Sequence, residues 1–188
     1  MTKLTVTQKR HYSAHNALLR VADDFLVAAE NQERFCSEGD FVALVMSALA
    51  IESLCNTVGE LIFVDWKDYE RARPTAKIRL ICSQLNIPYE KNSDPFQGIR
   101  WLLKFRNKIA HAKPESLHEK SETSSEAIQW LQSGSGPQSE IEKMITIGSA
   151  KRALKSVEQF EDMIVEKLPE DKKYLVGGDF WEMHTDES

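Results

Sequence analysis

The sequence is poor in cysteine: it has three in 188 residues, far apart in the chain and without a CxxC pair. An odd, scattered set of this kind excludes a dense disulfide framework and a cysteine-based zinc site. We therefore interpret Cys36, Cys55 and Cys82 as reduced thiols in a cytoplasmic protein. We expect neither a cofactor nor a metal ion.

Long hydrophobic runs are also missing. The longest apolar stretch, Phe41 to Ile51, is too short to span a bilayer and is followed at once by Glu52. The N-terminal segment MTKLTVTQKRHY contains no apolar stretch long enough for a signal peptide. The sequence therefore predicts a soluble protein without membrane association.

Positive charge is in deficit overall, because 24 Lys and Arg residues face 29 Asp and Glu residues, for a formal net charge of −5. Non-specific affinity for nucleic acid comes mainly from neutralising phosphates, so this balance argues against a protein that coats nucleic acid with its whole surface. It does not exclude a local basic site. A chain of 188 residues with 41% hydrophobic residues is sufficient for one domain with a real core.

Hydrophobic periodicity predicts helices, and no segment alternates with period two for long enough to indicate a strand. The expected fold class is all-α, an up-and-down bundle of about five helices. These helices are expected over residues 7–31, 40–63, 74–85, 94–111 and 149–168. His11 and His15, four residues apart in the first of them, share a face but have no acidic or thiol partner nearby, so we expect solvated surface histidines.

The bundle is expected to occupy residues 1–168, and residues 169–188 form a tail whose apolar side chains could dock on the body or on a second subunit. Residues 115–140 are rich in Ser and Glu and contain the helix-breaking sequence Gly-Ser-Gly-Pro. They predict a long mobile loop before the last helix, pinned to the body at most by a short turn around Trp130.

The stretch DPFQGIRWLLKFRNKIAHAKP, residues 94–114, has helix signals at both ends. Ser93 or Asp94 could cap the N-terminal amides, Pro95 suits the first helical position, and Pro114 should end the helix close to His111. An apolar stripe runs along this helix through Ile99, Leu102, Leu103 and Ala110. At about 100° per residue, Arg106 falls in the middle of that stripe, where an apolar residue is expected.

A second charge occupies an apolar position in the helix predicted over residues 40–63. Glu52 falls inside its hydrophobic cluster, and an unpaired carboxylate there would be costly. We therefore predict that Glu52 pairs with Arg106. Asn56, one helical turn after Glu52, could complete the network.

Residues 95–114 contain no Asp or Glu but five cations, which are Arg100, Lys104, Arg106, Lys108 and Lys113. In an acidic protein this stretch indicates an anion-facing surface, and phosphate is the natural anion for it. The same stretch ends in Arg106-Asn107-Lys108-Ile109-Ala110-His111.

Arg106 and His111 are five residues apart, so they point about 140° from each other on an ideal helix, whereas Asn107 and His111 share a face. Within one subunit Arg106 and His111 are therefore expected to make a poor catalytic pair. Two copies of the helix end meeting across a two-fold axis would bring two Arg, two Asn and two His to one cleft. The negative end of the helix dipole attracts a protonated imidazole at His111, which makes this residue a candidate proton-transfer group.

Residues 106–111 resemble the Rx4–6H motif of the HEPN superfamily, including the polar residue that often follows the arginine. The segment Ser47 to Asn56 is similar to the helix that carries an acidic residue in many of these proteins, and the resemblance covers roughly residues 40–114. It implies an α-helical bundle that dimerises through the motif helices. Many family members are metal-independent endoribonucleases of toxin–antitoxin, abortive-infection or CRISPR systems, and others only bind RNA or protein partners.

By this resemblance, Arg106 would bind the phosphate, Asn107 would orient it and His111 would transfer a proton. The 2′-hydroxyl of RNA would attack and leave a 2′,3′-cyclic phosphate, without a metal. The resemblance also implies a homodimer and a possible antitoxin or effector partner. The alternatives are that Arg106 is a structural partner of Glu52, that His111 only caps a helix, and that the chain is a non-catalytic RNA- or protein-binding or dimerisation module.

Overall fold

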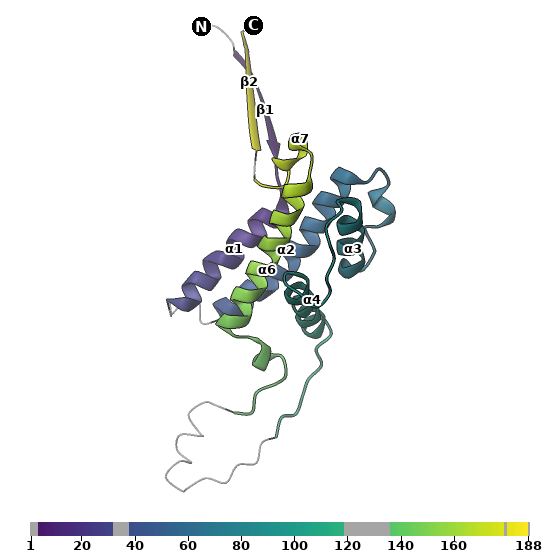
Figure 1. Cartoon of the computed structure of the whole chain (residues 1–188). Helices are drawn as coiled ribbons and strands as arrows, with labels where there is room; N and C mark the ends of the chain where they lie inside the picture. Colours follow the sequence, from purple (N-terminus) through teal and green to yellow (C-terminus); the bar gives the residue numbers. More distant parts are fainter. Residues whose placement is uncertain (1–3, 32–37, 119–135, 179, 188) are drawn as a thin grey trace.

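The computed structural model describes residues 4–31, 38–118, 136–178 and 180–187, which form a bundle of α-helices (Figure 1). The helices are α1 (Ala14–Glu30), α2 (Gly39–Ile62), α3 (Pro74–Gln84), α4 (Phe96–Ala110), α6 (Ile147–Lys167) and the short α7 (Glu170–Lys173), with 3-10 helices η2 (Trp66–Asp68) and η3 (Glu142–Met144). The predicted all-α fold is confirmed. The bounds of α2, α3, α4 and α6 differ from the expected ones by at most two residues.

Helix α2 is the centre of the bundle. Helices α1, α3, α4 and α6 all contact it, and α1 and α6 run alongside it in Figure 1. Its buried side chains lie on every side rather than in one stripe: Ala43, Leu44, Ser47, Ala48, Ala50, Ile51, Leu54, Cys55 and Val58. Among the described residues, α2 is the one helix long and apolar enough to cross a membrane. Half of its most apolar stretch is buried in the structure, as in the central helix of a soluble bundle.

Two of the three cysteines belong to this core, and both are free and buried. Burial raises the pKa of the Cys82 thiol to about 11. Burial likewise raises the pKa of Cys55, against a smaller opposing effect of the Lys77 charge. The interpretation of Cys55 and Cys82 as free thiols is confirmed, while Cys36 lies outside the described residues.

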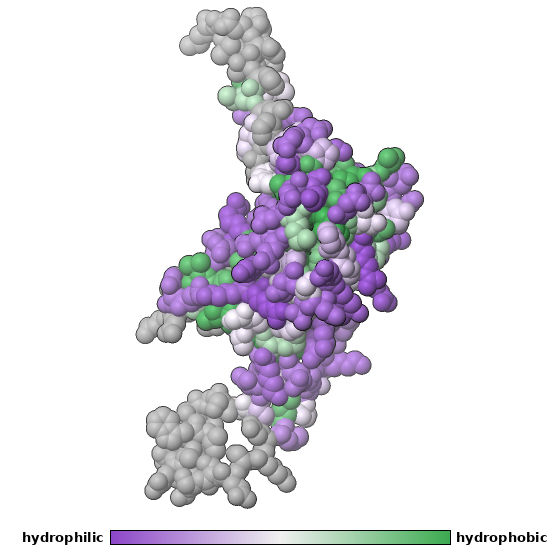
Figure 2. Space-filling model, in the orientation of Figure 1, coloured by the Kyte–Doolittle hydropathy of each residue, from purple (hydrophilic) through white to green (hydrophobic). Residues whose placement is uncertain are grey.

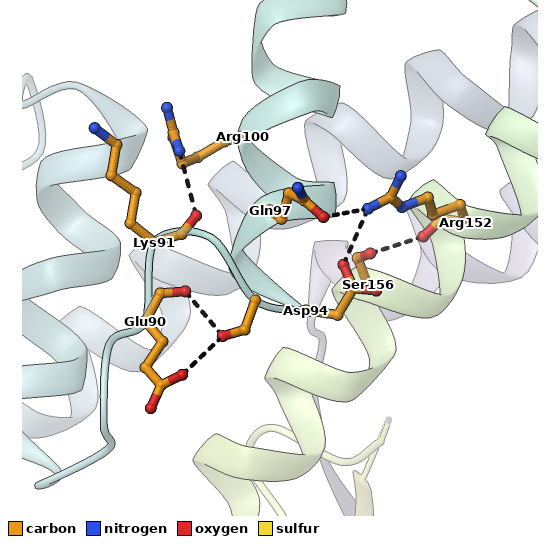
Figure 3. A network of polar contacts seen from close by, with 8 residues as sticks. Glu90, Lys91, Asp94, Gln97, Arg100, Arg152 and Ser156 are labelled. Atoms are coloured by element: carbon orange, nitrogen blue, oxygen red, sulfur yellow. Dashed lines mark hydrogen bonds and ion pairs between the residues drawn. The ribbon is translucent and has the colours of Figure 1, made fainter.

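Helix α4 presents Ile99, Leu102, Leu103 and Phe105 to the core, so the predicted apolar stripe is confirmed for the first three. It was wrong for Ala110, which is exposed at the end of the helix. The helix ends at Ala110 with His111 as the C-terminal cap residue, as the following Pro114 predicted. Its start differs from the prediction, because Pro95 itself occupies the N-cap position and no side chain caps the helix. The Asp94–Pro95 peptide bond is cis. Asp94 instead faces α6, where the Arg152 Nη2 atom donates to Asp94 Oδ1 at 3.3 Å and to Gln97 Oε1 at 2.7 Å (Figure 3).

The two ends of the chain form a β-ribbon, which contradicts the expected absence of strands and the expected helix start at residue 7. Strand β1 (Leu4–His11) pairs antiparallel with β2 (Phe180–Glu187), and α1 begins only at Ala14. The ribbon extends away from the helices and carries both termini at its far end (Figure 1). The helical prediction was wrong here because the partner that satisfies the backbone of β1 is about as distant in sequence as the chain allows.

The segment after α6 docks on the start of α1. Val176 is fully buried, and its carbonyl accepts hydrogen bonds from His15 Nε2 at 3.1 Å and Asn16 Nδ2 at 2.9 Å. The Leu175 carbonyl accepts from Ser13 Oγ at 3.0 Å and from His11 Nε2 at 3.2 Å. Docking of the tail on the body is therefore confirmed for this segment. The expectation of solvated histidines was wrong, since His15 is fully buried and His11 is half-buried.

The expected loop over residues 115–140 begins and ends without helix or strand at residues 115–118 and 136–139. The rest of that prediction, including the turn around Trp130, lies outside the described residues. The face of the molecule in Figure 2 is mainly hydrophilic, with apolar residues gathered where α2 ends and, on the left, where α1 ends. Val64, in the turn that follows α2, is 99% exposed.

Candidate functional site

The candidate site is built on an ion pair between α4 and α2. Arg106 Nη2 donates to Glu52 Oε2, so the predicted pairing of the two charges placed in apolar stripes is confirmed. The pair is only partly buried, since 31% of the Arg106 side chain and 34% of the Glu52 side chain are exposed. It therefore holds α4 against α2 while leaving part of the guanidinium open to the surface.

Arg106 is held at a second point by its neighbour. Its Nη1 atom donates to Asn107 Oδ1 at 3.2 Å, and its buried Nε atom has no hydrogen-bond partner among the described residues. Both terminal nitrogens of Arg106 are thus engaged by protein side chains, and the guanidinium has a fixed orientation.

Asn56 does not complete this network as predicted. Its Oδ1 atom accepts instead from Lys77 Nζ at 2.7 Å, and Lys77 is fully buried. The ammonium group also lies 6.0 Å from the centre of the Trp66 ring. Lys77 was not among the residues singled out from the sequence. Its position next to the inward-facing Ile78 was the available sign that its side chain is buried. Asn56 therefore anchors α3 to α2 rather than supporting Arg106.

A cleft of about 560 Å³ opens between the end of α4 and the start of α3. It is lined by Arg73, Pro74, Thr75, Leu103, Arg106, Asn107 and His111. The three motif residues thus line one cleft of a single chain, and the meeting of two copies of this helix end across a two-fold axis stays a prediction. His111 is the C-cap residue and departs from helical geometry, with φ −118° and ψ 16°, so the angle of an ideal helix does not describe its side chain.

A second cleft of about 440 Å³ adjoins the first along α4. Arg100, Lys104 and Lys108 line it, and it shares Thr75, Leu103 and Asn107 with the first cleft. Three of the predicted RNA-binding cations therefore lie beside the motif residues. Lys113 lies past the end of α4 and is exposed. The residues that line the two clefts include no Asp or Glu, so both favour an anion.

The cations of the second cleft are not all free. Arg100 Nη1 donates to the Lys91 carbonyl at 3.2 Å, in the turn before α4 (Figure 3). Lys108 lies close enough to Glu140 to help lower the pKa of that carboxyl, after the larger effects of a hydrogen bond to Lys143 and the Lys143 charge. Lys104 is exposed on α4 between Arg100 and Lys108.

Two lining residues were missed in the sequence, and both belong to the start of α3. Arg73 and Thr75 flank Pro74 and form the wall opposite Arg106 and His111. The sequence Arg-Pro-Thr was the available signal, because Pro is favoured at the first position of a helix. It therefore indicates that Arg73 and Thr75 lie at the start of a helix.

Chemically, a cleft with guanidinium, amide and imidazole groups can bind a phosphate and transfer a proton. Among the residues that the structure describes, no three His, Cys, Asp or Glu side chains are grouped as metal ligands. Comparisons of the chain with protein-family models, curated proteins and solved structures found no significant match. The HEPN resemblance therefore stays an expectation from the sequence motif.

Proposed function

We propose that this chain is a HEPN-type, metal-independent endoribonuclease that acts as a homodimer in a defence or toxin role in the cytoplasm. The observation that carries the proposal is the cleft shared by Arg106, Asn107 and His111, next to a second cleft lined by cations. If His111 only capped the helix, it would need neither Arg106 and Asn107 in the same cleft nor the cations of the second cleft.

In the proposed reaction, the cleft holds one phosphodiester of single-stranded RNA. The 2′-hydroxyl loses its proton to an imidazole and its oxygen forms a bond to phosphorus, while the bond from phosphorus to the 5′-oxygen breaks. The departing 5′-oxygen takes up a proton, and a 2′,3′-cyclic phosphate remains. In a dimer the second His111 could supply that proton, and cationic side chains would stabilise the extra negative charge on the phosphate.

The decisive experiment incubates purified protein with single-stranded RNA in EDTA, for the wild type, His111→Ala and the matched control His118→Ala. His118 is also an exposed histidine, but it lies beyond the residues that line the clefts. We expect the wild type and His118→Ala to cleave and His111→Ala to lose at least about 100-fold in rate, since general acid–base groups contribute that much. DNA of the same sequence should stay intact.

Uncut RNA with pure, folded, dimeric wild-type protein would refute the ribonuclease proposal. Cleavage by His111→Ala at the wild-type rate would refute the role of the motif. Light scattering on the same samples tests the homodimer, and co-purification with proteins of the native host tests for an antitoxin or effector partner.

The second candidate is a non-catalytic module that binds RNA or a protein partner through the same surface. It is favoured by one observation, namely that Glu52 and Asn107 already engage both terminal nitrogens of Arg106. In that case His111→Ala would leave RNA binding unchanged, whereas Lys104→Glu and Lys108→Glu would weaken it.

A further inference from the structure

Arg73 occupies an unusual place in the cleft of about 560 Å³. It is the residue before α3, it has an extended backbone with φ −60° and ψ 142°, and its side chain is exposed. Among the residues that the structure describes, its guanidinium makes no hydrogen bond or ion pair. A lining arginine with all its donors available is suited to an external ligand.

Arg106, on the α4 side of the cleft, already donates hydrogen bonds within the protein. Glu52 neutralises its charge, and each terminal nitrogen donates one of its hydrogen bonds in this way, to Glu52 Oε2 and to Asn107 Oδ1. A phosphate in the cleft would therefore meet an ion pair on the α4 side. The uncompensated positive charge comes from Arg73, together with His111 when its imidazole is protonated.

The wall that carries Arg73 is fixed in place. The amides of Ala76 and Lys77 donate to the Arg73 carbonyl at 2.8 Å and 3.2 Å, which closes the first turn of α3. Four residues after Arg73, the buried Lys77 ties α3 to Asn56 of α2. Because the Arg73 backbone is held relative to α2, only its side chain must be ordered when a ligand binds, and this reduces the entropic cost.

We propose that Arg73 is the phosphate-binding arginine of this cleft, and that Arg106 is a positioning residue that holds Asn107 and the end of α4 in place. The ligand is a phosphodiester group of a single-stranded nucleic acid, and its identification as RNA rests on the proposed function. The assignment differs from the role that the sequence motif implies for Arg106.

Binding is measured by fluorescence anisotropy with a short labelled single-stranded DNA, which offers phosphates but no 2′-hydroxyl and is therefore not consumed. The variants are Arg73→Ala, Arg73→Lys and the matched control Arg71→Ala. Arg71 lies two residues before Arg73 and is exposed, and it is not among the residues that line either cleft. Arg71→Ala removes the same charge as Arg73→Ala.

We expect Arg73→Ala to weaken binding roughly tenfold or more, as for loss of a charge-assisted hydrogen bond. The slope of log affinity against log salt should fall by about 0.7, the value for one lost phosphate contact on a single strand. Arg73→Lys should keep most of the salt slope and part of the affinity, and Arg71→Ala should bind within about twofold of the wild type. Circular dichroism checks that each variant is folded.

Equal weakening by Arg73→Ala and Arg71→Ala would overturn the assignment, and so would a wild type that does not bind the probe. If binding depends on Arg73 but RNA is never cleaved, the assignment stands and the ribonuclease proposal fails. If RNA is cleaved and Arg73→Ala cuts at the wild-type kcat/KM, the ribonuclease proposal stands and the assignment fails.

Discussion

Glu52 and Arg106 join the central helix of the bundle to the helix that carries the motif, at the border between the core and the cleft. Each is set in an apolar stripe, next to fully buried residues such as Ile51 and Phe105. Each side chain is nevertheless about one-third exposed, so solvent and ligands reach the pair. The pair is thus a tie between α2 and α4, and its Arg106 member also lines the cleft.

The first prediction concerns the stability that this pair contributes. Glu52→Gln should lower the free energy of unfolding by about 1 to 2 kcal/mol, because a partly buried guanidinium loses its charged partner. A double-mutant cycle with Arg106→Met, measured by urea unfolding, should give a favourable coupling of about 1 kcal/mol.

The matched control is the ion pair between Lys151 and Glu30, where the side chains are 54% and 37% exposed. Lys151→Ala should change the free energy of unfolding by less than about 0.5 kcal/mol, as is typical of exposed pairs. A coupling between Glu52 and Arg106 no larger than that would show that the pair does not stabilise the fold.

The Glu52–Arg106 pair was predictable because each residue is a charge at an apolar position of an amphipathic pattern, and such charges need partners. The same patterns located α2, α3, α4 and α6. The β-ribbon was not predictable in this way, since β1 depends on a partner strand at the other end of the chain. Similarly, Arg73 enters the site only because the start of α3 lies across the cleft from the end of α4, and helix periodicity contains no information about which helix ends come together.

The second prediction concerns the close approach of α4 to α6. A Cβ atom on Gly98 would lie 2.0 Å from Ser156 Oγ and 2.9 Å from Ser156 Cβ. Gly98→Ala should therefore destabilise the protein by about 1 to 3 kcal/mol in urea unfolding. Adding Ser156→Gly should restore most of the loss, whereas Gly148→Ala, whose nearest contact would be 3.9 Å away, should be neutral or slightly stabilising. A neutral Gly98→Ala would show that the two helices separate at little cost.

The third prediction concerns the docking of the C-terminal segment on α1. His15→Ala removes a fully buried ring and its hydrogen bond to the Val176 carbonyl, and should lower the free energy of unfolding by about 2 to 3 kcal/mol. Asn16→Ala, which removes the second donor to that carbonyl, should cost about 1 kcal/mol.

Arg20→Ala on the exposed face of α1 is the control, with an expected change in the free energy of unfolding below about 0.5 kcal/mol. If His15→Ala unfolds at the same urea concentration as Arg20→Ala, the segment is not docked in solution.

The fourth prediction concerns Glu158 on α6, which lies near Asp23 of α1 and near Glu161 and Asp162. Desolvation, followed by repulsion from Asp23, Asp162 and Glu161, raises the pKa of this carboxyl above its ordinary value of 4.5. A raised acid pKa means that ionised Glu158 destabilises the folded state at neutral pH, and that this cost disappears as the pH falls through the raised pKa towards 4.5. Glu158→Gln should therefore raise Tm by roughly 1 to 3 °C at pH 7 and leave it unchanged near pH 4, in thermal melts followed by circular dichroism.

Glu166→Gln is the control, because Glu166 Oε1 lies 3.1 Å from Lys167 Nζ. This substitution removes an attraction, so Tm should stay constant or fall slightly at pH 7. An equal rise in Tm at both pH values for Glu158→Gln would assign the effect to packing and contradict the electrostatic cause.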